Sequence, residues 1–211
     1  MSKYQPKFAV LVSGSGTLAD AILKAGLPVK LMVADQPCKA VDKVAPKHEV
    51  KAVVVSRQDY GYIPKKAKLD RKAFTKAVAE VLHKNKVDGA ILAGWDTILD
   101  ASFFTPKNFY GRVLNSHPAL LPAYKGIGHA VPPQIKDKVK VSGTTIHVAS
   151  ADVDGQPYLF QEEVKVLRGD TVDSLHERIK VVERRLWLQA VWQWSSLIKA
   201  NPNFRWPVVK P

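Results

Sequence analysis

The sequence predicts an α/β fold, with a doubly wound, mostly parallel central sheet that is flanked by helices and followed by a long C-terminal helix. Short and fully apolar runs such as Phe8–Val12 are typical of parallel strands that are buried on both faces. These runs alternate along the chain with segments of helical periodicity, and such alternation indicates a Rossmann-like arrangement of βαβ units. A length of 211 residues suits one domain, residues 1–211, with an irregular tail from about 201 to 211.

The amino-terminal half contains four apolar runs that predict parallel strands, at 8–12, 29–34, 52–55 and 87–93. The first strand leads through a glycine-containing loop into a helix over 18–24, which Gly26 closes. A second helix is expected over 39–48, and an exposed loop over 56–69. Asp70 is the expected N-cap of a third helix, whose apolar side chains keep a helical spacing: Phe74, Val78, Val81 and Leu82.

The carboxyl-terminal half begins with a strand that ends at His117, because the proline that follows cannot donate to a strand ladder. A loop rich in glycine and proline is expected over 123–133, followed by a basic helical segment. Two further strands are predicted at 141–148 and 158–166, with a tight turn at Asp152–Gly155 between them.

A long helix completes the predicted fold. Asp170 or Thr171 should cap it, since apolar side chains then recur at spacings of three and four. Its later part contains three tryptophans that we expect to be core or packing aromatics: Trp187, Trp192 and Trp194.

The composition is that of an ordinary globular protein, with 46% apolar and 24% charged residues. No stretch approaches the roughly 20 apolar residues of a membrane span, and the N-terminus has no signal-peptide pattern, so we expect a cytoplasmic protein. The single cysteine, Cys38, excludes an internal disulfide framework and most thiolate metal sites.

The net charge of +13 is the least ordinary property of the sequence. Its lysines are spread along the chain, so we interpret the charge first as a solvated surface and second as attraction for small anionic substrates. A non-catalytic nucleic-acid module is a third interpretation, although no basic motif interleaved with aromatic residues is present.

The glycine-containing loop after the first strand suits an anion. A strand, a glycine loop and a helix start expose backbone N–H groups at the positive end of a helix, and these residues are Ser13, Gly14, Ser15, Gly16 and Thr17. The loop also fits the dinucleotide fingerprint, with Asp35 near the position that binds ribose. An NAD(P)-dependent oxidoreductase is therefore one hypothesis, whereas the absence of a following Gly-Lys-Ser/Thr excludes a Walker-type site.

A second set of polar residues lies where the fifth strand ends. Asn115 and His117 are two residues apart, so they project from the same face of the strand. In open α/β sheets, ligands bind outside the carboxyl ends of the strands. An amide and an imidazole are both suitable donors to an oxyanion, so the pair favours acyl or formyl transfer.

Six stretches carry a resemblance to a known family, in the same order: Val10–Thr17, Leu92-Ala-Gly94, Gly111–Pro122, Gly143–His147, Asp152–Pro157 and His176–Arg185. Through them the chain resembles the glycinamide ribonucleotide formyltransferases, a family of folate-dependent formyltransferases, over nearly its whole length. The resemblance implies transfer of the formyl group of 10-formyltetrahydrofolate, a co-substrate, to the amine of glycinamide ribonucleotide in de novo purine synthesis.

The resemblance also implies a catalytic trio of Asn115, His117 and Asp154. Asn115 would donate to the formyl oxygen, a protonated His117 would donate and help to move the amine proton, and Asp154 would keep the imidazole charged and oriented. The substrate phosphate would lie on Ser13–Thr17, and Glu183 would lie beside the amine. The reduced folate would lie against Leu92, Trp95, Asp96, Thr97, Ile98, Leu99, Val148, Ala149 and Asp152.

Three departures from the family pattern bear on the substrates. Trp95-Asp96-Thr97 stands where the family usually has Phe-Met-Arg, the loop 123–133 differs in composition, and Leu18 replaces a frequent asparagine. Hydrolysis of 10-formyltetrahydrofolate, or formylation of another amine, therefore stays open. His147 matches a family histidine and is either a hydrogen-bonded core side chain or a catalytic part. We expect small-molecule substrates, no metal and no membrane partner, and leave a homodimer open.

Overall fold

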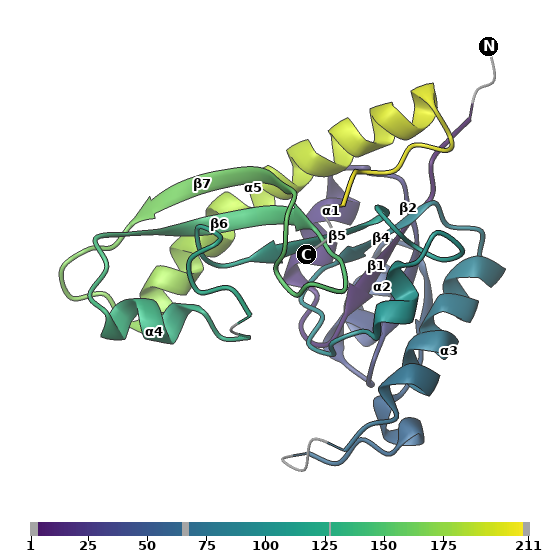
Figure 1. Ribbon diagram of the computed structural model, residues 1–211, viewed down its shortest axis with the longest axis horizontal. Helices are drawn as coiled ribbons and strands as arrows, with labels where there is room; N and C mark the ends of the chain where they lie inside the picture. Colours follow the sequence, from purple (N-terminus) through teal and green to yellow (C-terminus); the bar gives the residue numbers. More distant parts are fainter. Residues whose placement is uncertain (1–3, 65–67, 127, 209–211) are drawn as a thin grey trace.

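In the computed structural model, the described residues 4–64, 68–126 and 128–208 form a seven-stranded sheet with helices on both faces (Figure 1). The order of the strands in the sheet is β3-β2-β1-β4-β5-β6-β7. The strands are β1 (Phe8–Val12), β2 (Val29–Ala34), β3 (Lys51–Val54), β4 (Gly89–Leu92), β5 (Val113–His117), β6 (Val141–Val148) and β7 (Tyr158–Lys165).

The strands from β1 to β5 run parallel to their neighbours, whereas β6 pairs antiparallel with β5 and β7 pairs antiparallel with β6. The mostly parallel, doubly wound fold is therefore confirmed. The chain builds outward from β1 through β2 to β3 and then returns to place β4 on the other side of β1. The carboxyl ends of β1 and β4 thus meet at the switch point, where ligands bind in folds of this kind.

The helical elements mostly begin where the sequence predicts. They are α1 (Thr17–Lys24), the π-helical turn η1 (Ala40–Val44), α2 (Ala45–Lys47), the 3₁₀ turns η2 (Arg57–Tyr60) and η3 (Ala101–Phe104), α3 (Arg71–Lys84), α4 (Val131–Lys136) and α5 (Val172–Ala200). The Asp70 carboxylate caps α3 by accepting a 3.0 Å hydrogen bond from the Ala73 amide. Of the two expected caps of α5, Thr171 has this role, in a reciprocal capping box with Ser174.

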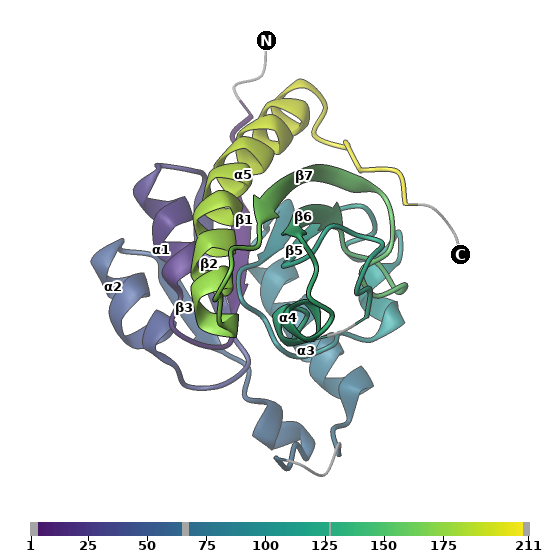
Figure 2. The same ribbon diagram turned by 90° about the vertical axis from the view of Figure 1, so that its left-hand side faces the viewer.

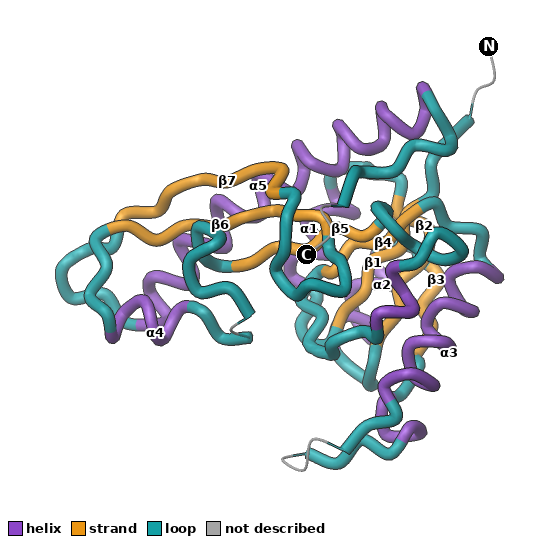
Figure 3. The backbone as a smooth tube through the Cα atoms, in the orientation of Figure 1, coloured by secondary structure: helices purple, strands orange, loops and turns teal. Residues whose placement is uncertain are grey.

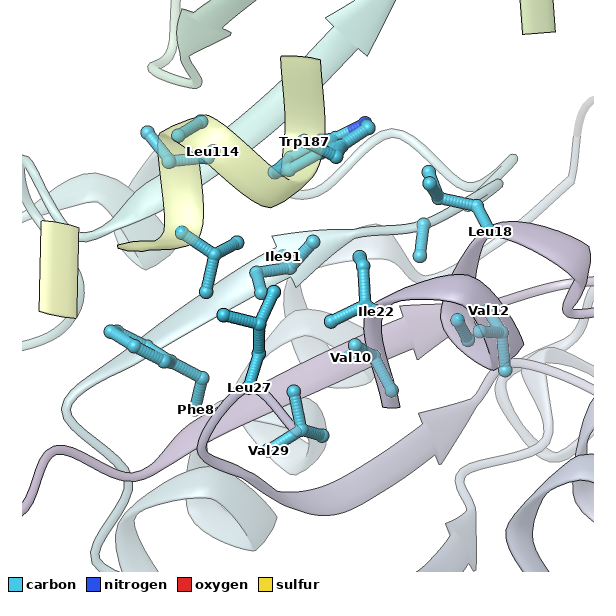
Figure 4. Close-up of a cluster of buried hydrophobic side chains, with 14 of the residues drawn as sticks. Phe8, Val10, Val12, Leu18, Ile22, Leu27, Val29, Ile91, Leu114 and Trp187 are labelled. Carbon is cyan, nitrogen blue, oxygen red and sulfur yellow. The ribbon is translucent and has the colours of Figure 1, made fainter. Parts of the chain in front are cut away.

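Strand β1 is fully apolar because each face of the sheet has its own core. Val10 lies with Leu114 and Trp187 in a cluster beneath α1 and α5 (Figure 4). Its neighbour Leu11 lies in a second cluster with Phe74 of α3, on the opposite face (Figure 2). The helices therefore cover the two faces of the sheet on which β1 packs.

Two expectations about the fold are wrong in detail. Helix α4 begins at Val131, inside the predicted loop, because Pro132 and Pro133 occupy its first turn, where a missing N–H group costs nothing. Trp192 is not a packing aromatic, since 56% of it is exposed, whereas Trp187 and Trp194 are fully buried.

The loop predicted at 56–69 contains the η2 turn and an isolated bridge between Ile63 and Lys68, while residues 65–67 lie outside the described part of the chain.

The segment after α5 is irregular and folds back onto the amino end of β5. The Trp206 amide donates to the Gly111 carbonyl at 2.9 Å, and Arg205 Nη1 donates to the Tyr110 carbonyl at 2.9 Å. Arg112 Nη2 donates to the Pro202 carbonyl at 2.6 Å. Among the described residues, no helix is both long enough and apolar enough to cross a membrane.

Candidate active site

The site lies where β5 ends beside the antiparallel strand β6. Asn115 and His117 face the same side of the sheet, and the register pairs Asn115 with His147 and His117 with Thr145. Because residues opposite each other in a ladder share a face, both histidines and the asparagine amide converge on one side.

Asp154 completes this cluster from the turn between β6 and β7. Its Oδ2 atom lies 3.3 Å from Nδ1 of His117, and the Gly126 amide donates to the same oxygen at 3.0 Å. Both partners are almost shielded from water, with 4% of His117 and 6% of Asp154 exposed. Asp154 has a φ of 53°, a left-handed conformation in which an aspartate is tolerated better than most residues. The structure thus brings together three residues that are far apart in the sequence.

Burial and the neighbouring charges shift the pKa values of His117 and Asp154 in opposite directions. Burial disfavours the cation and lowers the pKa of His117, and the Asp154 carboxylate and the Tyr124 carbonyl offset only part of this effect. Asp154 thus favours the charged imidazole, as expected of a carboxylate, but burial has the larger effect on the pKa of His117. Burial alone would raise the pKa of Asp154, but hydrogen bonding to His147, the nearby His117 and the Gly126 amide together lower it. The carboxylate consequently stays ionised beside a ring that is easily neutral.

His147 is a fourth member of the cluster, which the sequence left undecided. Its Nε2 atom lies 3.2 Å from Nδ2 of Asn115 and 3.5 Å from Oδ1 of Asp154. Its Nδ1 atom is buried and has no hydrogen-bond partner among the residues that the structure describes. The imidazole therefore lies between the asparagine amide and the carboxylate.

The loops after β5 and after β6, drawn as teal tubes in Figure 3, contact each other where the Gly126 amide donates to the Asp154 carboxylate. Nε2 of His117 lies 3.0 Å from the Tyr124 carbonyl oxygen, and Lys125 forms a 2.7 Å ion pair with Asp152. Both ring nitrogens of His117 thus face protein oxygens in this conformation. Sequence reasoning missed this contact because a loop carbonyl has no residue-type signature.

Ser15 and Thr17 of the glycine loop are exposed, whereas Ser13 is turned inward and its amide donates to the Gly94 carbonyl at 2.8 Å. Ser13 is buried, and its Oγ accepts a 2.8 Å hydrogen bond from the Asp96 amide. Gly16 has a φ of 72°, and a Cβ atom there would lie 2.6 Å from Cβ of Ala40, so only glycine fits. The amides of Ser15, Gly16 and Thr17 donate to no other described residue. These N–H groups are therefore available as hydrogen-bond donors to an anion.

Glu183 reaches the same strand from the other face. Its carboxylate accepts a short hydrogen bond from Ser116 Oγ, and Ser116 points away from the face that carries Asn115 and His117. Burial raises the pKa of Glu183, and the Ser116 hydroxyl and nearby cations lower it by less. The structure therefore separates Glu183 from the imidazole cluster by the thickness of β5.

The segment expected to bind folate forms the edge after β4. Trp95 Nε1 donates to the Thr97 carbonyl at 2.6 Å, which bends the segment into a compact turn. Burial, followed by the charge of Asp35, raises the pKa of Asp96. The other expected residues lie at this edge or in the loop after β6: Leu92, Ile98, Leu99, Val148, Ala149 and Asp152.

The ribose-binding role considered for Asp35 is contradicted. Asp35 is fully buried, and its Oδ2 atom accepts from Thr97 Oγ1 at 2.6 Å and lies 3.3 Å from Nη1 of Arg57. A side chain enclosed in this way cannot reach a nucleotide, so the dinucleotide hypothesis loses its acidic residue. Among the described residues, no cluster of three or more metal-ligating side chains is present.

Comparisons with known proteins agree with this geometry. A family model described as formyl transferase matches residues 6–191. The phosphoribosylglycinamide formyltransferase of Mycobacterium tuberculosis is 37% identical over 190 residues, covering 88% of this chain and 83% of the relative. The protein of the same name from Bacillus subtilis is 31% identical, covering 90% and 95%. Glycinamide ribonucleotide transformylase 1 from Symbiobacterium toebii superposes with a TM-score of 0.79 at 32% identity, covering 91% and 88%.

Proposed function

This chain belongs to the formyl transferase family, and from that membership we propose that it transfers a formyl group to the amine of glycinamide ribonucleotide in purine synthesis. The formyl donor in this proposal is 10-formyltetrahydrofolate, and both substrates are small molecules. The observation that carries the proposal is the convergence of Asn115, His117 and Asp154 at one strand end. We place the enzyme in the cytoplasm, because proteins of that reducing compartment usually lack disulfides and the single cysteine of this chain is free.

Asn115 is the donor for the oxygen on which negative charge develops. An amide nitrogen carries two N–H groups, and Nδ2 of Asn115 lies 3.2 Å from Nε2 of His147. The contact holds the amide in place, and an N–H group directed away from the ring can donate to the formyl oxygen. Such a pre-oriented donor stabilises the transition state more than the ground state.

His117 is the proton carrier. Because burial lowers its pKa, the ring is neutral near pH 7 and can accept the proton that the attacking amine must lose. Asp154, 3.3 Å from Nδ1, then stabilises the imidazolium that forms. The folate supplies the electrophilic formyl carbon, and its leaving nitrogen takes the proton from the imidazolium as the bond between that nitrogen and the formyl carbon breaks.

Substrate access requires the loop over His117 to move. Nε2 of His117 faces the Tyr124 carbonyl oxygen, so the ring can exchange a proton with a substrate only after that contact breaks. The amides of Ser15, Gly16 and Thr17 would hold the phosphate. The edge at Trp95–Leu99 and the loop after β6 would hold the folate through backbone groups.

The proposal is tested by replacing Asn115 with alanine. We expect kcat to fall by roughly 10²–10³, because one donor to the developing oxyanion is lost. The measurement is the absorbance change of 10-formyldideazafolate with glycinamide ribonucleotide present and absent. Asn203→Ala, at an exposed asparagine in the C-terminal segment, is the matched control and should retain full turnover.

Each outcome decides between functions. Release of the formyl group without the amine would identify a hydrolase, and turnover only with a different amine would identify another formyltransferase. Wild-type turnover in both Asn115→Ala and His117→Ala would reject the proposed site altogether.

A further inference from the structure

The outer face of α5 carries a stripe of exposed apolar side chains. Val181 and Trp192 are 60% and 56% exposed, and Leu188 between them is half-buried. At 3.6 residues per turn, these three side chains lie within a sector of about 40° around the helix axis. Figure 2 shows α5 in front of the sheet, and the side of the helix that packs on β6 and β7 carries its buried residues instead. The stripe therefore faces away from the sheet and from the imidazole cluster.

An aligned stripe differs from scattered exposure. A single exposed apolar residue is ordinary on a protein surface, and Ile63, 42% exposed in the loop after η2, is an example. Contiguous apolar surface that is bordered by polar residues is typical of a contact with another molecule. The proposed reaction gives the stripe on α5 no role.

The charged residues of α5 are distributed unevenly along its length. Its second half, from Arg184 to Ala200, contains cations but no carboxylate. Glu177 and Lys199 extend the stripe at its two ends, eleven residues before Leu188 and eleven residues after it. All the carboxylates of the helix lie in its first half: Asp173, Glu177 and Glu183. A helix with this charge distribution is complementary to an antiparallel copy of itself.

Both end charges are available for such a contact. In the described parts of the chain, no carboxylate lies within ion-pair distance of Lys199. Glu177 forms a 2.8 Å ion pair with Lys180, three residues along the same helix. Exposed pairs of this kind contribute little to stability, so Glu177 can exchange Lys180 for another cation at small cost.

We propose that two copies of this chain pair through this stripe, with their α5 helices antiparallel and Leu188 close to the two-fold axis. Contacts across a two-fold axis are reciprocal, so Glu177 of each copy then meets Lys199 of the other, once at each end. Val181 and Trp192 lie on opposite sides of Leu188, so Trp192 of one copy covers the region of Val181 on the other, and both lose contact with water. A parallel pair would instead place like charges against each other. The stripe is narrow, so the dimer should be weak, with a dissociation constant of about 10–100 µM.

The inference does not depend on the proposed function, and its test is the oligomeric state of the full-length chain. Sedimentation velocity at low salt, from about 1 µM to 1 mM protein, should show the wild type passing from monomer to dimer, with less dimer as salt is added. Trp192→Gln should raise the dissociation constant roughly tenfold or more, because an enclosed tryptophan anchors a contact. Ile63→Gln, which removes an exposed apolar side chain outside α5, is the matched control and should associate like the wild type.

Charge reversal tests the antiparallel arrangement. Glu177→Lys and Lys199→Glu should each raise the dissociation constant roughly five- to tenfold, because like charges then meet at both ends of the contact. The double variant, Glu177→Lys with Lys199→Glu, exchanges the two charges and should associate nearly as well as the wild type. Recovery in the double variant requires that the two positions meet across the dimer.

The inference is overturned if the wild type remains a monomer over the whole range, as it would if a different protein or a lipid surface occupied the stripe. It is also overturned if Trp192→Gln associates like the wild type, if Ile63→Gln weakens association equally, or if the double variant associates no better than the single variants. Circular dichroism identifies any variant that misfolds, and the remaining variants then decide.

Discussion

His117 is held between two oxygen atoms while it is almost shielded from water, and these two conditions oppose each other. The Tyr124 carbonyl at 3.0 Å and the Asp154 carboxylate at 3.3 Å favour the charged ring, and burial favours the neutral ring more strongly. The pKa of His117 is therefore lowered, while the Asp154 carboxylate remains in place to stabilise an imidazolium when the ring takes up a proton.

The titration of His117 tests this balance. Its pKa should lie below the ordinary value of about 6.5, because burial disfavours the cation. In Asp154→Asn the pKa should fall further, because the offsetting carboxylate is lost. Asparagine is preferred to alanine here, since the positive φ of residue 154 disfavours most side chains. Nitrogen chemical shifts of the imidazole, followed by NMR over a pH series, measure both values.

Asp152→Asn is the matched control for that titration, since the Asp152 carboxylate is bound to Lys125 and exposed. Its effect on the pKa of His117 should be small. An unchanged or higher pKa of His117 in Asp154→Asn would contradict the assigned roles of burial and the carboxylate.

The lowered pKa also predicts how stability depends on pH. The unfolded chain binds the proton more readily than the native protein. The contribution of His117 to the stability of the fold is therefore complete above about pH 6.5 and decreases as the pH falls through the native pKa.

The ends of β2, β3 and β4 are joined by a buried polar network around Arg57. Its Nη1 atom faces Asp35 and its Nη2 atom donates to Gln36 at 2.7 Å, while the guanidinium lies 4.2 Å from the centre of the Tyr62 ring. Asp35 in turn holds Thr97. The turn expected to bind folate is therefore fixed from the neighbouring strands.

Replacement of Arg57 by methionine should cost about 3–5 kcal/mol of unfolding free energy, because the fully buried Asp35 loses its charge partner. Denaturant unfolding measures this change. The double variant Arg57→Met with Asp35→Asn should recover part of the loss, since no buried charge is then left unpaired. A single variant as stable as the wild type would show that the pair contributes nothing.

The C-terminal segment is the other element whose role is visible only in the structure. The Trp206 amide donates to the Gly111 carbonyl, the Arg205 side chain donates to the Tyr110 carbonyl, and the Arg112 side chain donates to the Pro202 carbonyl. Trp206 also packs against the main core. These contacts lie at the amino end of β5, about 16 Å along the strand from His117.

Truncation after Asn201 should lower the unfolding free energy by about 2–4 kcal/mol, through lost hydrogen bonds and exposed aromatic surface. The kcat of the folded fraction should stay unchanged, since the segment is remote from the imidazole cluster. Chemical denaturation and the formyl-transfer assay on the same preparation separate the two effects. Arg168→Ala, in an exposed turn, is a control that should change neither.

For the molecule as a whole, local sequence patterns predicted the strands and the faces to which their side chains point, because neighbouring residues determine both. The buried strands were evident because Phe8–Val12 and Val29–Ala34 are almost wholly apolar. The shared face of Asn115 and His117 followed from strand alternation. The position of Asp154 came from the resemblance alone, because no local pattern indicates which turn returns to β5.

The remaining features depend on contacts between distant segments. Asp35 occupies the position expected of a ribose ligand, and only the nearby Thr97 and Arg57 reveal that it is enclosed. The Tyr124 carbonyl over His117 is main chain and has no sequence signal. Trp192, by contrast, lies only two residues from the buried Trp194 and faces outward from α5, so helical periodicity alone could have indicated its exposure.

The segments before β1 and after α5 share an anchor. Tyr4 and the Lys7 amide bond to Asp88, and Arg112 links the Asp88 carbonyl to Pro202. A circularly permuted gene could therefore join these segments with a short linker and reopen the polypeptide in the exposed turn at Gly169. The permutant would keep every residue of the imidazole cluster in place while α5 became the first element to leave the ribosome.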